Sequence, residues 1–218
     1  MTADGKNHIR RTGVLPTLII TALLAATVYL LFVKTEKANT AEDMKQNERI
    51  AFNAIGLISK AQAQYIKRDH DNNGKLEYSR FIPHLWRTIG KNNEKIQLDL
   101  IDKKLAFAIE QNLASNGYYF EQKFTNILPE TGERVDMDFE KEWGALMIPA
   151  AKDTGYLTFF TDQSGNIYAC HSDRRRTVPN EPDTNDSWIL VKDIQEVISL
   201  QQTISDKYES LIVTLTRR

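Results

Sequence analysis

The stretch from Gly13 to Val33 constrains the fold of this chain more than any other feature, because it contains no charged residue. A helix of that length is about 30 Å long, which matches the hydrocarbon core of a lipid bilayer. Arg10 and Arg11 precede the stretch, and Lys34 follows it. The sequence therefore predicts a transmembrane helix over 13–33 that tethers the rest of the chain to a membrane.

The flanks of this stretch predict a permanent, single-pass anchor and its orientation. A secretory signal has an apolar core of about 7–15 residues and ends in small residues at its cleavage site. Here the apolar stretch is longer and ends in the bulky residues 29–33. The short segment 1–12 carries Arg10 and Arg11. Because positive charge favours the cytoplasmic side, we expect 1–12 in the cytoplasm and the body on the other side of the membrane.

The composition predicts one ordinary soluble domain behind the anchor. Of the 218 residues, 41% are hydrophobic and 26% are charged, and the net charge is −1. The chain has no surplus of basic residues, so its composition does not indicate nucleic acid as a partner. Cys170 is the single cysteine, which excludes an intramolecular disulfide and a cysteine-rich metal site.

Apolar periodicity predicts two amphipathic helices after the anchor. Residues 41–68 contain no proline, and their apolar residues recur at three- and four-residue spacing. This predicted stripe comprises Ile50, Ala54, Leu57, Ile58, Ala61 and Tyr65. With the polar segment 34–40, the helix would form a stalk over 34–68. The same spacing predicts a second helix over 93–114, where residues 115–117 (Ser-Asn-Gly) provide a C-terminal cap.

The second half of the chain predicts a small antiparallel sheet of three or four strands. The expected strands cover 118–124, 143–148, 155–161 and 166–170, and 126–141 is expected to be a polar loop. Residues 162–165 (Asp-Gln-Ser-Gly) have the pattern of a type I hairpin loop, in which glycine supplies the positive φ. The expected fold class is α+β.

The C-terminal part of the sequence predicts a loop and a further helix. Residues 173–187 are rich in proline, asparagine and aspartate, which is typical of a loop. Apolar residues from Leu190 to Leu215 follow at helical spacing, so 188–218 is predicted to be a helix. The β-branched residues of 211–216 leave a strand there as the alternative.

Several local segments resemble the type IV pilins and the pseudopilins of type II secretion. They are 48–65 (ERIAFNAIGLISKAQAQY), 74–78 (GKLEY), 116–120 (NGYYF) and 155–169 (GYLTFFTDQSGNIYA). The resemblance spans about 14–172 and implies a long N-terminal helix packed on the sheet of a globular domain over 69–172. It also implies a bacterial inner-membrane location with the body in the periplasm. Its partners would be other subunits or copies of itself, through the N-terminal helix. The helix predicted over 188–218 lies outside the resemblance and is a second candidate surface for such partners.

One departure from this family concerns processing. Residues 10–13 (Arg-Arg-Thr-Gly) resemble the end of a prepilin leader, after which the family has phenylalanine and, at the fifth mature position, glutamate. Here Val14 and Leu18 occupy those two positions. In that family, this glutamate pairs with a neighbouring subunit during fibre assembly. The departure favours a permanently anchored, pilin-like body over a processed fibre subunit.

The best ligand-like motif is a calcium-loop pattern. Asp69, Asp71, Asn73 and Glu77 fall at loop positions 1, 3, 5 and 9, and Gly74 falls at position 6. The backbone carbonyl of Lys75 would be the ligand at position 7. Position 12, which normally holds a bidentate glutamate, is Arg80. The motif therefore indicates either a weak calcium site or a turn that ends the preceding helix.

No other motif carries a recognisable chemistry. The sequence has no nucleophile elbow, P-loop or dinucleotide fingerprint, so we predict no enzymatic activity and no cofactor beyond calcium. His84 is expected to be a packing residue, and Cys170 and His171 are neighbours whose side chains should point to opposite faces of a strand. Arg174, Arg175 and Arg176 form a short basic run that is expected to be solvated surface.

Two functional hypotheses follow. The first is a non-enzymatic, membrane-anchored structural or accessory component of a secretion or pilus-type assembly. The alternative is a solitary inner-membrane-anchored periplasmic sensor or protein-binding module.

Overall fold

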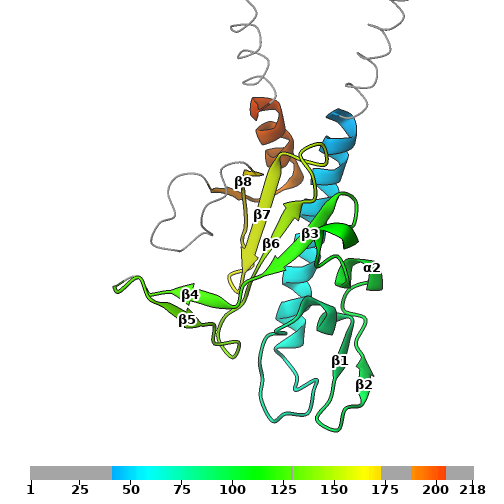
Figure 1. Ribbon diagram of the computed structural model, residues 1–218, viewed down its shortest axis with the longest axis vertical. Coiled ribbons are helices and arrows are strands. Elements are labelled where there is room, and N and C mark those ends of the chain that lie inside the picture. The colour runs from blue at the N-terminus through cyan, green and yellow to red at the C-terminus, as the bar shows by residue number, and fades with distance from the viewer. Residues whose placement is uncertain (1–40, 129, 173–187, 205–218) are drawn as a thin grey trace, which may run out of the picture. The chain divides into compact units, whose positions relative to one another are not determined.

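A helix over residues 41–65 lies along one face of a five-stranded antiparallel sheet (Figure 1). This computed structural model describes residues 41–128, 130–172 and 188–204. The chain divides into the units Met1–Glu42 and Asp43–Arg218, and the fold is that of the second unit. The predicted α+β class with a small antiparallel sheet is confirmed. The predicted anchor 13–33, the loop 173–187 and residues 205–218 lie outside the described residues.

The sheet is built from neighbouring antiparallel strands in the order β3-β6-β7-β8-β9. The strands are β3 (Tyr118–Gln122), β6 (Gly144–Pro149), β7 (Leu157–Asp162), β8 (Ile167–His171) and β9 (Ile189–Val191). The first four match predicted strands. Between β7 and β8 the amide of Gly165 donates to the carbonyl of Asp162 at 3.0 Å, and Gly165 has a φ of +76°. The predicted hairpin loop is therefore confirmed.

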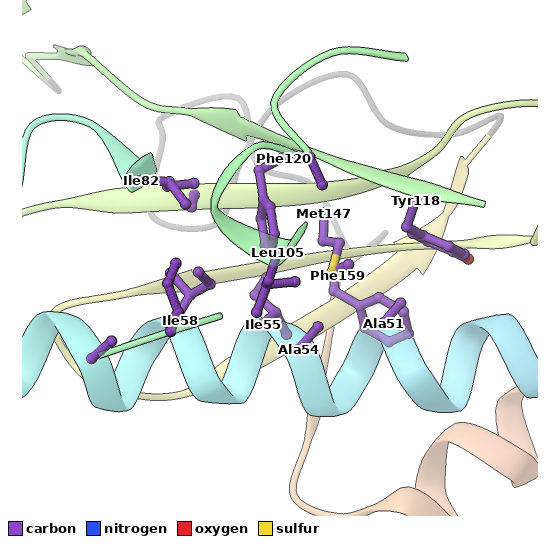
Figure 2. Packing of buried hydrophobic residues seen from close by; sticks show 14 of the residues in the cluster. Ala51, Ala54, Ile55, Ile58, Ile82, Leu105, Tyr118, Phe120, Met147 and Phe159 are labelled. Carbon is purple, nitrogen blue, oxygen red and sulfur yellow. The ribbon is translucent and has the colours of Figure 1, made fainter. Parts of the chain in front are cut away.

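The core lies between the helix 41–65 and the inner face of the sheet (Figure 2). Because side chains alternate along a strand, every second residue of β3, β6 and β7 points to the helix. These inner residues are Tyr118, Phe120, Ala145, Met147, Leu157 and Phe159. On the helix, Ala51, Ile55 and Ile58 are at most 1% exposed. The helix is thus an integral part of the core.

The helix 41–65 ends three residues earlier than predicted, and one residue of its predicted stripe faces outward. Leu57 is 51% exposed, whereas Ile55 and Ile58 are fully buried. An α-helix turns by about 100° per residue, so Leu57 lies about 200° around the axis from Ile55. The face that meets the sheet instead includes the polar residues Glu48 and Gln62, which are fully buried.

The prediction of a helix over 93–114 is wrong. This region and the residues before it contain η1 (Ile82–Leu85), the hairpin β1 (Arg87–Ile89) and β2 (Lys95–Gln97), α2 (Lys103–Ala106) and η2 (Gln111–Leu113). Asn93 and Asp99 have positive φ values of 62° and 50°, which a helix cannot contain. Asp102 then starts α2, because its Oδ1 accepts a hydrogen bond from the Leu105 amide at 2.9 Å.

Two further predictions are corrected. The predicted loop 126–141 contains an antiparallel pair, β4 (Thr125–Ile127) and β5 (Arg134–Asp136). In the segment predicted as a helix from 188, residues 189–191 form the edge strand β9, and a helix covers 194–204. Asp193 begins that helix, since its Oδ1 accepts hydrogen bonds from the amides of Gln195 (2.8 Å) and Glu196 (3.1 Å).

Candidate functional site

The predicted calcium loop begins where the helix 41–65 ends, and its aspartates bind its own backbone. The two carboxylate oxygens of Asp69 accept hydrogen bonds from the amides of Asn73 (3.0 Å) and Gly74 (2.9 Å). Gly74 has a φ of +88°, as the sharp turn at position 6 requires. The Gly74 amide is the main reason that the pKa of Asp69 is lowered. The hydrogen bonds of the Asp69 carboxylate therefore stabilise the turn itself.

Three of the predicted ligands lie together around the side-chain amide of Asn73. Its Nδ2 donates to Asp71 Oδ2 at 3.0 Å and to Glu77 Oε1 at 3.1 Å. The amide group thus bridges two carboxylates, a role that a cation could also fill. Asn73 would then have to turn its Oδ1 toward that position, because only the oxygen can ligate a metal.

The charges around this cluster only partly balance. Burial, and then a hydrogen bond with Asp69, raise the pKa of Asp71. Arg80 Nη2 lies 3.6 Å from Glu77 Oε2, whose side chain is 11% exposed. Arg80, which stands where a calcium loop has its bidentate glutamate, therefore contributes positive charge. The ammonium group of Lys75 points elsewhere and pairs with Glu140.

The loop also fastens the neighbouring β1–β2 hairpin. The Lys91 amide donates to the Asp71 carbonyl at 2.8 Å, and Asn72 Nδ2 lies 3.5 Å from Glu94 Oε1. Within the part of the chain that the structure describes, no group of three or more His, Cys, Asp or Glu side chains has a metal-binding arrangement. The geometry shows a helix-ending turn, and calcium binding stays a prediction to be tested.

The remaining sequence candidates are distributed over separate parts of the fold. His84 is half-buried, its ring centre lies 5.3 Å from that of Phe81, and burial lowers its pKa. Cys170 is buried and forms no disulfide. The His171 ring stacks on Tyr156 at 6.3 Å. Residues 174–176 lie outside the described residues.

Sequence reasoning missed a buried carboxylate in the helix 41–65. Glu48 is fully buried, and its carboxylate accepts hydrogen bonds from the amides of Tyr156 and Leu157 and from Gln201 Nε2. Burial raises the pKa of Glu48, although these hydrogen bonds act in the opposite direction. Helical spacing could have predicted this burial, because Glu48 lies three residues before the buried Ala51 and seven before the buried Ile55.

A second missed feature is an aromatic ring with two cations beside it. The guanidinium carbon of Arg87 lies 4.5 Å from the centre of the Trp86 ring, and Lys103 Nζ lies 5.5 Å from it. The Phe107 ring packs edge-on against Trp86 with 5.6 Å between centres. No sequence motif marks this cluster, because its residues come from the end of η1, from β1 and from α2.

The fold defines an α+β protein in which a long helix is packed on an antiparallel sheet. Comparisons with models of known families, with curated proteins and with solved structures give no match. Within 41–128, 130–172 and 188–204, no helix is both long enough and apolar enough to cross a bilayer.

Proposed function

We propose that this chain is a non-enzymatic, membrane-anchored envelope protein of the pilin or pseudopilin type, acting as a structural or accessory component of a secretion or pilus-type assembly. The observation that carries the proposal is the helix 41–65 on the antiparallel sheet. It follows the uncharged stretch 13–33 in the sequence and is part of the core of the body. The resemblance of 48–65 and 155–169 to pseudopilins supports the same assignment.

The packing of the helix 41–65 suits a body that is anchored through this helix and binds partner proteins. Ile55 and Ile58 are fully buried against the sheet, and Asn47 Nδ2 donates to the Thr154 carbonyl at 3.2 Å. The helix therefore cannot leave the sheet without exposing the core, which would cost several kcal/mol. A body held this firmly would present its surfaces to partners in a fixed orientation relative to its stalk helix.

Membrane fractionation of the full chain in a bacterium tests the anchor. We expect the protein in the membrane fraction after alkaline carbonate washing, and we expect Leu24→Arg to release a large part of it. An arginine at the centre of a span costs about 2.5–3.5 kcal/mol. Leu57→Arg is the matched control, because Leu57 is exposed on the described helix and the change should leave fractionation unaltered. A wild-type protein that carbonate releases would contradict the proposal.

Mass spectrometry of the purified chain distinguishes a permanently anchored protein from a processed prepilin. An intact N-terminus indicates a permanent anchor, whereas a chain that starts at Val14 indicates prepilin-type processing. Size-exclusion chromatography of the full chain in detergent then tests assembly with other copies. A strict monomer that copurifies with no envelope component would favour the solitary sensor or binding module.

A further inference from the structure

We propose that Trp86, Arg87, Lys103 and Phe107 form a docking surface for an acidic segment of a partner protein. We call these four residues the Trp86 surface. This inference rests on the proposed function, which sets where the partner is found. The chemistry of the partner is inferred from the geometry of the described residues.

The Trp86 surface gathers two positive charges at one aromatic ring. Arg87 lies 4.5 Å and Lys103 lies 5.5 Å from the ring centre, so the two charges are within about 10 Å of each other. Lys103 and Phe107 are exposed, and Trp86 and Arg87 are half-buried. One extended acidic segment is long enough to reach both cations, since each residue of an extended chain spans about 3.3 Å.

Carboxylates of the described residues leave these two cations available. The cations that form ion pairs within 4.0 Å in this part of the chain include Lys75, Arg80 and Lys141, and neither Arg87 nor Lys103 takes part in those pairs. The acidic residues closest in sequence to Lys103 have other roles. Asp102 Oδ1 accepts from the Leu105 amide, and Asp99 Oδ1 accepts from Gln97 Nε2.

The surroundings favour a peptide over a bare anion. Phe107 is 38% exposed, and because its ring packs against Trp86 it places apolar surface beside the cations. Tryptophan and arginine are the residues most enriched at the energetic centres of protein interfaces. Arg87 can bind a carboxylate with two parallel hydrogen bonds, while Phe107 covers an adjacent apolar side chain of the same segment.

The backbone beneath the ring is held by several hydrogen bonds. The Trp86 carbonyl accepts from the amides of Leu98 and Asp99, both at 3.0 Å, and from Gln97 Nε2 at 3.2 Å. These contacts join the start of β1 to the segment that follows β2. A preordered surface loses less conformational entropy when a partner binds, which favours affinity.

The Trp86 surface lies beside the C-terminal end of the helix 41–65. Thr88, which follows Arg87 in β1, has its Oγ1 3.4 Å from Tyr65 Oη. From residue 43 to residue 65 the helix rises about 33 Å, so the surface is far from the N-terminal end of this helix.

Fluorescence anisotropy with a labelled acidic peptide tests the proposal on the full chain in neutral detergent micelles. The probe alternates glutamate with leucine and phenylalanine, and a matched peptide has glutamine in place of each glutamate. We expect saturable binding of the acidic probe and at least tenfold weaker binding to the Arg87→Gln/Lys103→Gln variant. The control variant Lys91→Gln/Lys152→Gln changes the net charge equally at exposed positions and should bind within twofold of wild type.

Three results would overturn the proposal. Equal affinity of the wild type and the Arg87→Gln/Lys103→Gln variant would exclude this surface, and equal affinity for the glutamine peptide would exclude charge recognition. Phosphatidylglycerol vesicles that bind through the same residues, while the peptide does not, would assign the surface to lipid. Membrane fractionation of the Arg87→Gln/Lys103→Gln variant distinguishes a failure of this proposal from a failure of the proposed function. The variant should stay in the membrane fraction whether or not it binds the peptide.

Discussion

Glu48 and Gln201 meet in the interior of the protein although 153 positions separate them in the sequence. Gln201 Nε2 donates to the Glu48 carboxylate and, at 3.3 Å, to the Lys45 carbonyl. The pair joins the helix 194–204 to the helix 41–65, and both side chains are at most 3% exposed. The Tyr118 phenol belongs to the same buried region, where burial and the charge of Glu48 raise its pKa.

The raised pKa of Glu48 predicts how folding stability depends on pH. A carboxyl group with a raised folded-state pKa favours the folded protein fully below its unfolded pKa, which is near 4.5. That contribution is lost as the pH rises through the folded pKa. We therefore expect Glu48→Gln, which cannot ionise, to be more stable than wild type at pH 7 and similar to it at pH 4. Thermal melting of the full chain in micelles across this range measures the difference.

The control for this experiment is Glu48→Ala. It removes the acceptor for the amides of Tyr156 and Leu157, and each unsatisfied buried donor costs about 1–3 kcal/mol. We expect lower stability than wild type at both pH values. A Glu48→Gln protein that melts below wild type at pH 7 would contradict the inferred cost of the buried charge.

Ile55→Ala tests whether the helix 41–65 is part of the core. Ile55 is fully buried, so its truncation should cost about 2–5 kcal/mol through lost burial and a cavity. Leu57→Ala, at the neighbouring exposed position, should change stability by less than about 0.5 kcal/mol. Urea unfolding followed by tryptophan fluorescence provides the comparison, and similar losses at both positions would refute the assigned orientation of the helix.

Gly155 is predicted to be intolerant of any side chain. A Cβ atom there would lie 2.0 Å from Tyr118 Oη, which donates to the Leu157 carbonyl at 2.9 Å. Gly155→Ala should therefore displace the phenol and destabilise the protein by about 1–3 kcal/mol. Gly56→Ala is the opposite case, since its Cβ would lie 3.6 Å from Ile167 Cδ1 and alanine favours a helix by about 0.5–1 kcal/mol. A melting temperature that rises for Gly155→Ala would be inconsistent with this contact.

Calcium binding by the 69–77 loop is a prediction that a thermal-shift titration decides. If Asp69, Asp71, Asn73, Glu77 and the Lys75 carbonyl bind calcium, millimolar calcium should raise the melting temperature and excess EDTA should reverse the rise. At a hundred times the dissociation constant, the stabilisation would be about 2.7 kcal/mol. Asp71→Asn should abolish the shift, whereas Asp153→Asn at an exposed position elsewhere should not. No shift for the wild type would leave the loop as a turn.

Local patterns predicted most of the sheet and the central helix. The strands from 118 to 171 alternate or carry aromatic and β-branched residues, and the loop at 162–165 has the residues that its turn requires. The predicted helix over 93–114 failed because Ile101, Leu105 and Ala108 are buried at helical spacing within an irregular segment. Apolar spacing reports which residues are buried, but it does not exclude an irregular path that buries the same residues. Asn93 and Asp99 interrupted the helix through their positive φ values.

The sequence by itself determined the α+β class, the hairpin at 162–165 and the helical character of 41–65, because these depend on residues close together in the chain. Only the tertiary structure decided that Glu48 is buried against Gln201, that 189–191 complete the sheet, and that Arg87 and Lys103 share the Trp86 ring. Periodicity describes which face of an element is apolar. It carries no information on which distant element packs against that face. The packing partner determines the surroundings of the charged side chains.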